Sequence, residues 1–162
     1  MLERNWNEFL KKAIETGRVK DVEEAWKDNP VEDEIHQGKV AYFVAEESAE
    51  YNIYKTGDIV FVPTYKYENG EKGKNHLFVI IGQNNIAVTI ENFGMLISSR
   101  LEKLKYNSNK FLEKTEENGL RADSIVKTDV IYKIKNEQIL FKIGKVDMEK
   151  IEEYRKAFLE EK

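Results

Sequence analysis

Hydroxyl, cationic and carboxylate side chains gather at the ends of two strand-like segments in the second half of the chain. The first segment ends in Ser98, Ser99 and Arg100, and the second contains Lys127 and Asp129. Cleaving RNA without a metal requires a base for the 2′-hydroxyl proton, an acid for the leaving 5′-oxygen and cations that stabilise the phosphorane charge. Asp129 can serve as the base, and the two serines can hydrogen-bond the scissile phosphate. These residue types predict a nuclease-type site if the fold brings the two segments together.

Further candidates supply positive charge near the phosphate. Lys127, two residues before Asp129, projects from the same strand face if both residues have regular β geometry. His76 precedes an apolar strand-like run and can add cationic stabilisation. The remaining cations expected to bind RNA are Lys74, Arg100 and Lys103.

Each candidate also has a simpler structural interpretation. Ser98 and Ser99 can mark only the exit of a strand, because serine is common where strands give way to turns. Lys127 and Asp129 can form a solvated surface pair, and His76 can be a capping or surface residue. The residue types alone leave these interpretations open beside the nuclease.

Composition excludes several kinds of site. The chain has 162 residues, of which 41% are hydrophobic, so it can fold around a real core. It has no cysteine, and its two histidines lie forty residues apart, so neither a thiolate site nor a typical zinc site is expected. Gly-rich phosphate loops, Walker lysines and Gly-x-Ser-x-Gly elbows do not occur. The sequence predicts an activity that uses no cofactor and no metal.

The expected location is the cytoplasm. The N-terminus is charged and lacks the apolar stretch of a signal peptide. The longest apolar run, residues 77–81, is far too short to span a membrane. We therefore expect a soluble protein that makes no membrane contact.

Charge is unevenly distributed along the chain. Residues 1–50 carry a net charge of −6, residues 51–145 carry +4 and residues 146–162 carry −2. An acidic arm on a mildly basic body suggests that the two attract each other. The alternative is two solvated surfaces of unlike charge that never meet.

The pattern of apolar residues changes near residue 50. Helices are predicted over 4–16 and 19–28, and an acidic stretch with one apolar island follows to residue 50. Turn signals then separate predicted strands, with a turn over 82–85, a polar connection with a short helix over 101–117 and a helix over 147–158. The strands are expected at 58–63, 77–81, 86–90, 94–97, 124–134 and 139–143. We predict a mainly β, α+β protein in two domains: a helical or extended segment, 1–50, and a small β-barrel with a C-terminal helix, 51–162.

Six short motifs resemble, in order and spacing, those of the PemK/MazF toxin family. The resemblance runs from about Tyr54 to Phe158, which is about two thirds of the chain. The motifs are Gly57-Asp58-Ile59-Val60-Phe61-Val62, Lys74-Asn75-His76-Leu77 with the strand after it, Ile97-Ser98-Ser99, Gly119-Leu120-Arg121-Ala122-Asp123-Ser124-Ile125-Val126, Lys127-Thr128-Asp129 and Ile143-Gly144-Lys145. No single motif is specific, but their shared order is.

The resemblance implies an SH3-like barrel, a homodimer and metal-independent cleavage of single-stranded RNA. It implies Asp129 as the general base and Lys127 in the position of an arginine acid. Ser98 and Ser99 would take the phosphate-contacting positions. Membership of a toxin-antitoxin system also implies an antitoxin-like partner.

One departure from the family pattern is His76 followed by Leu77, where the family usually has Arg-Pro. A guanidinium that is always charged is replaced by an imidazole that is mostly neutral at pH 7. His76 can then act as the acid. Otherwise the protein is a catalytically inactive SH3-like barrel that binds nucleic acid or a protein partner.

The other departure is the segment 1–50, which ordinary members lack. Antitoxins of this family cover the basic groove of the toxin with acidic tails that carry apolar residues, and residues 21–50 are similar to such a tail. We expect this segment to fold back as an intramolecular inhibitor or to replace a partner at the dimer face. The alternative is a helical cap that merely covers one face of the barrel.

Overall fold

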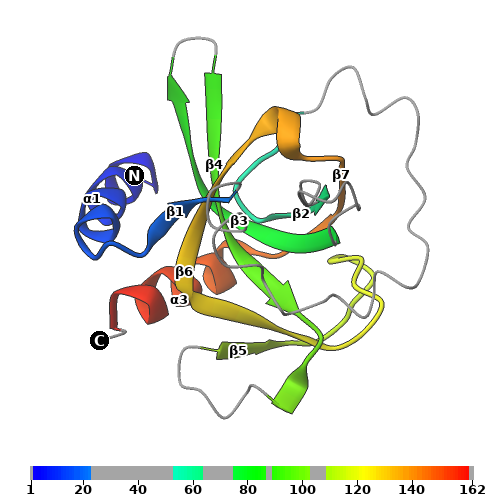
Figure 1. Ribbon diagram of the computed structural model, residues 1–162. Helices are drawn as coiled ribbons and strands as arrows, with labels where there is room; N and C mark the ends of the chain where they lie inside the picture. The colour runs from blue at the N-terminus through cyan, green and yellow to red at the C-terminus, as the bar shows by residue number, and fades with distance from the viewer. Residues whose placement is uncertain (1, 23–52, 64–74, 87–88, 103–108, 161–162) are drawn as a thin grey trace, which may run out of the picture.

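The computed structural model describes residues 2–22, 53–63, 75–86, 89–102 and 109–160 (Figure 1). The strands are β1 (Val19–Asp21), β2 (Asp58–Pro63), β3 (Asn75–Ile86), β4 (Thr89–Ser98), β5 (Asn109–Leu112), β6 (Ser124–Lys135) and β7 (Phe141–Lys145). The helices are α1 (Leu2–Glu15), the short 3-10 helix η4 (Asn136–Gln138) and α3 (Met148–Glu160). The predicted mainly β, α+β class is confirmed.

The strands form one sheet in the order β1-β6-β4-β3-β2-β7, and β5 also pairs with β6. One edge of β6 pairs with β4, and two strands pair with its other, outer edge. There β5 pairs antiparallel with residues 124–127, and β1 pairs parallel with residues 131–133. Strands β1 and β7 stand at opposite ends, and no described strand joins them. The described sheet is therefore not closed into a barrel, and the predicted SH3-like barrel is not confirmed.

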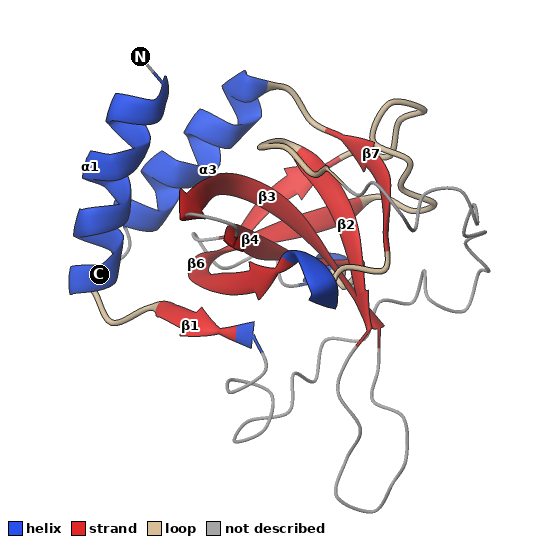
Figure 2. Ribbon diagram, turned by 90° about the horizontal axis from the view of Figure 1, so that it is seen from above, coloured by secondary structure: helices blue, strands red, loops and turns tan. Residues whose placement is uncertain are grey.

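Both faces of the sheet are buried, because the side chains of β3 alternate between two apolar clusters. Leu77, Val79 and Ile81 belong to one cluster, and Phe78 and Ile80 belong to the other. Helices α1 and α3 lie next to each other against the first face (Figure 2), which we call the helix face. The second is called the opposite face, and its other apolar members are Val22, Tyr54, Val60, Val62, Leu96, Ile134 and Ile139. Burial on both sides explains why β3 is apolar without alternation.

The predicted N-terminal helix is confirmed as α1, and it belongs to the main core. Its buried residues are Trp6, Phe9, Leu10 and Ala13. The ring centroid of Trp6 lies 5.4 Å from that of Phe93 in β4, and the ring of Phe9 lies 5.9 Å from that of Phe158 in α3. Residues 2–22 therefore share one core with the rest of the described chain. A domain boundary at residue 50 remains a prediction.

The turn predicted over residues 82–85 is wrong. Strand β3 continues through these residues and pairs with β4 as far as Ile86 and Thr89. A Cβ atom on Gly82 would lie 2.3 Å from the ring of Trp6, so this glycine makes room for the indole of α1. The indole Nε1–H also donates to Oδ1 of Asn84 at 2.9 Å.

Two short strands differ from the sequence prediction. The helix predicted over 19–28 is wrong at its start, since Val19–Asp21 form β1, and most of that range lies outside the described residues. Strand β5 falls within the segment 101–117, which was expected to be a connection. Both strands pair with the outer edge of β6, whose unpaired main-chain groups outweigh weak local preferences.

Two glycines allow the loop before β6 to pack directly against β7. A Cβ atom on Gly119 would lie 2.0 Å from the carbonyl oxygen of Ile143, and one on Gly144 would lie 2.2 Å from the carbonyl carbon of Asn118. Gly119 also has a φ of +69°, a conformation that costs other residues energy. Only glycine fits at either position, so this contact fixes where β6 begins.

We expect Gly119→Ala to destabilise the protein more than Gly17→Ala. Both glycines have positive φ, but a Cβ atom on Gly17 would meet nothing within 4 Å. Gly17→Ala should cost about 1 kcal/mol for the backbone conformation alone. Gly119→Ala should cost about 1–3 kcal/mol more, because the loop must also move away from Ile143. Urea unfolding of the two variants measures the difference, and equal losses would show that the close contact is unimportant.

Candidate functional site

The strand register brings His76 and Ser98 together on the opposite face. Leu77 of β3 pairs with Ile97 of β4, and both side chains belong to the helix face. Because neighbouring residues along a strand point to opposite sides, His76 and Ser98 lie beside each other on the other side of the sheet. Lys127 of β6 lies on the same face, because it pairs with Leu96 of β4, whose side chain belongs to the opposite face.

Two of these side chains are deeply buried. His76 is 1% exposed and Ser98 is 0% exposed. The hydroxyl oxygen of Ser98 accepts a hydrogen bond from the main-chain N–H of Arg100 at 3.1 Å. Ser98 thus stabilises the exit of β4, as the simpler interpretation proposes. A phosphate could reach either side chain only after this part of the face becomes accessible.

Asp129 lies in an irregular part of β6. Gly94 of β4 pairs with Tyr132, and Leu96 pairs with Lys127. Residues 127–132 of β6 therefore lie opposite only residues 94–96 of β4. The prediction that Lys127 and Asp129 share a face depends on regular β geometry. That condition is therefore not met. The main-chain carbonyl of Asp129 accepts a hydrogen bond from Nη1 of Arg18 at 2.8 Å.

The remaining predicted residues are more exposed or lie outside the described ranges. Ser99, Lys127 and Asp129 are half-buried. Nε of Arg100 donates to a carboxylate oxygen of Glu102 at 3.0 Å in an exposed ion pair, which contributes little to stability. The two predicted RNA-binding lysines outside the described residues are Lys74 and Lys103.

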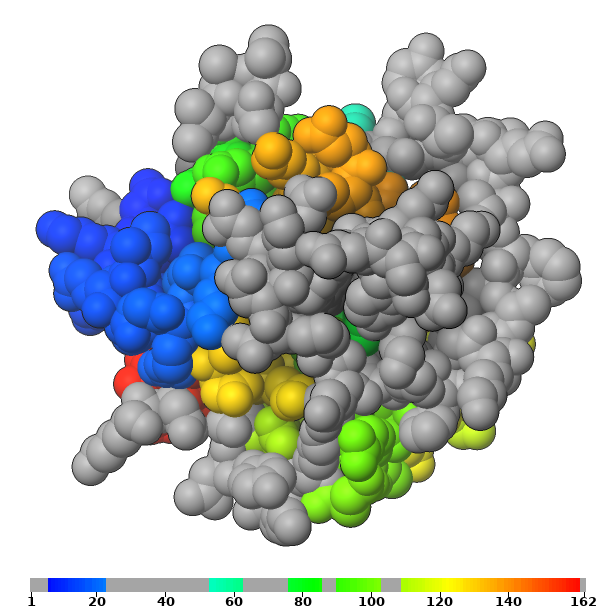
Figure 3. All heavy atoms as spheres, viewed as in Figure 1, coloured from blue at the N-terminus to red at the C-terminus, as the bar shows by residue number. Residues whose placement is uncertain are grey.

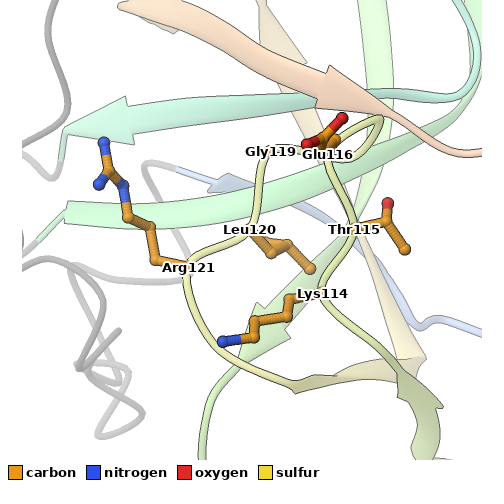
Figure 4. A pocket seen from close by; sticks show the side chains of 6 residues that line it. All are labelled: Lys114, Thr115, Glu116, Gly119, Leu120 and Arg121. Carbon is orange, nitrogen blue, oxygen red and sulfur yellow. The ribbon is translucent and has the colours of Figure 1, made fainter.

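The loop before β6 borders a shallow hollow of about 470 Å³ (Figure 4). Its lining residues are Lys114, Thr115, Glu116, Gly119, Leu120 and Arg121. Both Lys114 and Arg121 are exposed and can contact phosphate oxygens. Sequence reasoning missed these two cations, although they flank the Asn118-Gly119 turn and could have been found from that position.

Asn118 holds this loop in shape. Its side-chain oxygen accepts hydrogen bonds from the main-chain N–H groups of Thr115 and Leu120, each at 3.0 Å. Its side-chain nitrogen donates to the carbonyl of Glu113 at 2.8 Å. The residue is buried, so these three bonds replace contacts with water.

The Gly57-Asp58 motif also has a structural role. One carboxylate oxygen of Asp58 accepts the main-chain N–H of Lys55 at 2.8 Å, and the other lies 3.5 Å from Nζ of Lys142 in β7. Gly57 approaches Val146, whose N–H donates to the Gly57 carbonyl at 2.8 Å. Burial raises the pKa of the nearby Tyr54, and the charge of Asp58 raises it further. This motif joins the first strand of the family-like region to the last.

Residues 55–160 match the model of a family described as the PemK-like, MazF-like toxin of type II toxin-antitoxin systems. The chain belongs to this toxin family. The resemblance predicted from the motifs is thus confirmed. A comparison with curated proteins gives no match.

The matched region of the toxin family begins after α1 and β1. Three of the motifs that carry the resemblance meet in the structure: Gly119 packs against Ile143, and Asp58 and Ile59 of β2 pair with Lys145 and Gly144 of β7. Of the predicted catalytic residues, His76 lies on β3, Ser98 on β4, and Lys127 and Asp129 on β6.

Within the described ranges, no group of three or more histidine, cysteine, aspartate or glutamate side chains is placed to hold a metal ion. None of the described helices is long and apolar enough to cross a membrane.

We expect Asn118→Ala to destabilise the protein by about 2–4 kcal/mol, because three hydrogen bonds are lost and two main-chain N–H groups lose their acceptor. Asn118→Asp keeps both accepting bonds but places a carboxylate oxygen opposite the Glu113 carbonyl at a buried site, so it should also destabilise the protein. Glu116→Ala, on the exposed side of the same loop, should change stability by less than about 0.5 kcal/mol. Thermal unfolding of the three variants tests this order, and a similar effect of Glu116→Ala would contradict it.

Proposed function

We propose that this toxin-family protein is a metal-independent endoribonuclease that cleaves single-stranded RNA. The observation that carries the proposal is the family match over residues 55–160, which includes every candidate catalytic residue. The placement of His76, Ser98 and Lys127 on one face of the sheet supports it.

In the proposed reaction, Asp129 removes the proton from the 2′-hydroxyl of the nucleotide before the scissile bond. The 2′-oxygen attacks phosphorus, and the bond to the 5′-oxygen breaks. Lys127 or His76 donates a proton to that leaving oxygen, while Ser98 and Ser99 hydrogen-bond the phosphate oxygens. The products are a 2′,3′-cyclic phosphate and a 5′-hydroxyl.

We propose that cations guide the RNA backbone towards this site. The predicted RNA-binding residues are Lys74, Arg100 and Lys103. Lys114 and Arg121 at the hollow before β6 extend the positive surface. Contacts between cations and phosphates fix the position of the RNA strand, and they weaken as salt is added.

We also propose that the acidic part of the N-terminal region restrains the site. Residues 23–52 contain nine acidic and two basic residues. The described residues on either side of this segment include Val22 and Tyr54, and both are buried in the opposite face, which also carries His76 and Ser98. Charge and the positions of these flanking residues therefore favour a segment that acts on this face.

The same proposal includes an SH3-like barrel, a homodimer, a cytoplasmic location and an antitoxin-like partner. The location follows from the sequence, and the other three features follow from the family resemblance. The acidic segment could take the place of the antitoxin.

A second candidate function is a binding module without catalysis. It is favoured by the burial of His76 and by its replacement of the family arginine. Such a protein would bind RNA or a protein partner through the same face.

We expect the purified protein to cleave a long single-stranded RNA in the presence of EDTA. Asp129→Asn should lower the rate by about 10²-fold or more, because it removes the proposed base. Ser98→Ala should also lower it. Glu137→Gln, an exposed carboxylate in η4, is the matched control and should leave the rate unchanged. Gel analysis of end-labelled RNA measures the rates.

RNA binding without cleavage would favour the binding module. Cleavage that survives Asp129→Asn would contradict the assignment of the base.

We expect neutralisation of Glu32, Asp33 and Glu34 to the corresponding amides to raise the cleavage rate and to reduce its dependence on salt, because the restraint is electrostatic. A truncation at residue 51 would be a poorer test, since it also removes α1 and β1 from the core. Neutralising Glu149, Glu152 and Glu153 on α3 is the control for net charge. Equal effects of the two sets would rule out a specific restraint.

A further inference from the structure

Arg18 joins three parts of the molecule that lie far apart in the sequence. It sits in the short link between α1 and β1. Its Nη1 donates to the carbonyl of Asp129 at 2.8 Å, and its Nη2 donates to the carbonyl of Phe158 at 2.9 Å. The centre of its guanidinium lies 4.0 Å from the ring centroid of Phe158. The carbonyl of Arg18 accepts the N–H of Ile131 at 2.9 Å.

These contacts hold the irregular part of β6 at two points, Asp129 and Ile131. Between Lys127 and Tyr132 the strand has three residues more than β4 can pair with. Extra residues in a strand are left out of the ladder, and their carbonyls need other partners. Arg18 supplies a charged donor to Asp129 and an acceptor to Ile131, two residues further on. The conformation of this part of β6 thus depends on a residue outside β6.

Residues 2–22, which include Arg18, are packed firmly against the rest of the described chain. Their helix buries Trp6 and Phe9 against the sheet and α3, and their strand pairs with residues 131–133 of β6. Figure 3 shows the blue N-terminal residues against the yellow surface of β6 and the red end of α3. The toxin-family match begins at residue 55, so this support comes from outside the matched region.

We propose that Arg18 is a positioning residue for Asp129: by binding the Asp129 carbonyl, it fixes the conformation of residues 128–131 and thereby the direction of the Asp129 carboxylate. This inference rests on the proposed function, in which Asp129 is the base. It assigns residues 2–22 a role opposite to that proposed for residues 23–52, because loss of the first lowers activity and loss of the second raises it.

The guanidinium geometry provides a sharp variant. Arg18→Lys keeps the positive charge and a long aliphatic stem, but a single ammonium cannot replace two nitrogens that bind two separate carbonyls in a fixed fork. Trp6→Phe is the matched control. It weakens the packing of α1 and removes the bond to Asn84, but it leaves the contacts of Arg18 with β6 in place.

The test measures kcat and KM for RNA cleavage in EDTA together with the melting temperature. Arg18→Lys should lower kcat by about 10- to 100-fold at a nearly unchanged KM, a loss that misplacement of a catalytic group can produce. Trp6→Phe should lower the melting temperature at least as much and leave kcat within about twofold. In the Asp129→Asn background, Arg18→Lys should have almost no further effect, because it acts through Asp129.

Equal loss of kcat in Trp6→Phe, or independent losses from Arg18→Lys and Asp129→Asn, would overturn the inference. If the wild-type protein does not cleave RNA, the proposed function fails, and amide hydrogen exchange then tests the positioning. In Arg18→Lys the N–H of Ile131 keeps its acceptor, the main-chain carbonyl of residue 18, so faster exchange there reports that residues 128–131 have loosened. We expect exchange about tenfold faster or more, while amides within α1 remain unchanged. Unchanged exchange at Ile131 would show that Arg18 does not hold this part of β6.

Discussion

Main-chain carbonyls that lose their place in a strand ladder must find other partners, and this constraint governs the sheet. The pairing of β3 with β4 shifts at Ile81, and the pairing of β4 with β6 shifts across residues 128–131. Arg155 of α3 donates to the carbonyl of Ile81 at 2.8 Å, and Arg18 donates to that of Asp129. Two arginines from outside the sheet therefore satisfy groups that the strands themselves leave without a ladder partner.

Arg155 also explains why α1 belongs to the core. It is only 8% exposed, and its guanidinium lies 5.0 Å from the ring of Trp6. Burial lowers the pKa of Arg155, but an arginine begins so high that it stays protonated. A buried cation is costly unless its surroundings compensate it, and here the Ile81 carbonyl and the Trp6 ring both do so. The indole reaches this position only because Gly82 has no side chain.

Local patterns were sufficient for the parts of the fold that depend on neighbouring residues. The spacing of Trp6, Phe9 and Ala13 predicts α1, and the order of the glycine-containing motifs predicts the family. Features that depend on distant partners could not be predicted. Strand β1 exists because β6 has a free edge, Gly82 looks like a turn until Trp6 is in place, and the face of Asp129 depends on a shift of register with β4. The proximity of His76 and Ser98 likewise follows from the pairing of β3 with β4, which periodicity alone does not specify.

The contact between Arg18 and Phe158 spans 140 residues, and it connects the link before the first strand to the last helix. Ribosomes deliver a chain from its N-terminus, so the segment that carries Arg18 is made 140 residues before its partner in α3. A nascent chain can form α1 early, but it cannot complete this three-way contact until α3 has emerged. The order of synthesis thus delays the finished arrangement of β6 until α3 has been made, so this toxin-family protein cannot complete the contact early in its translation.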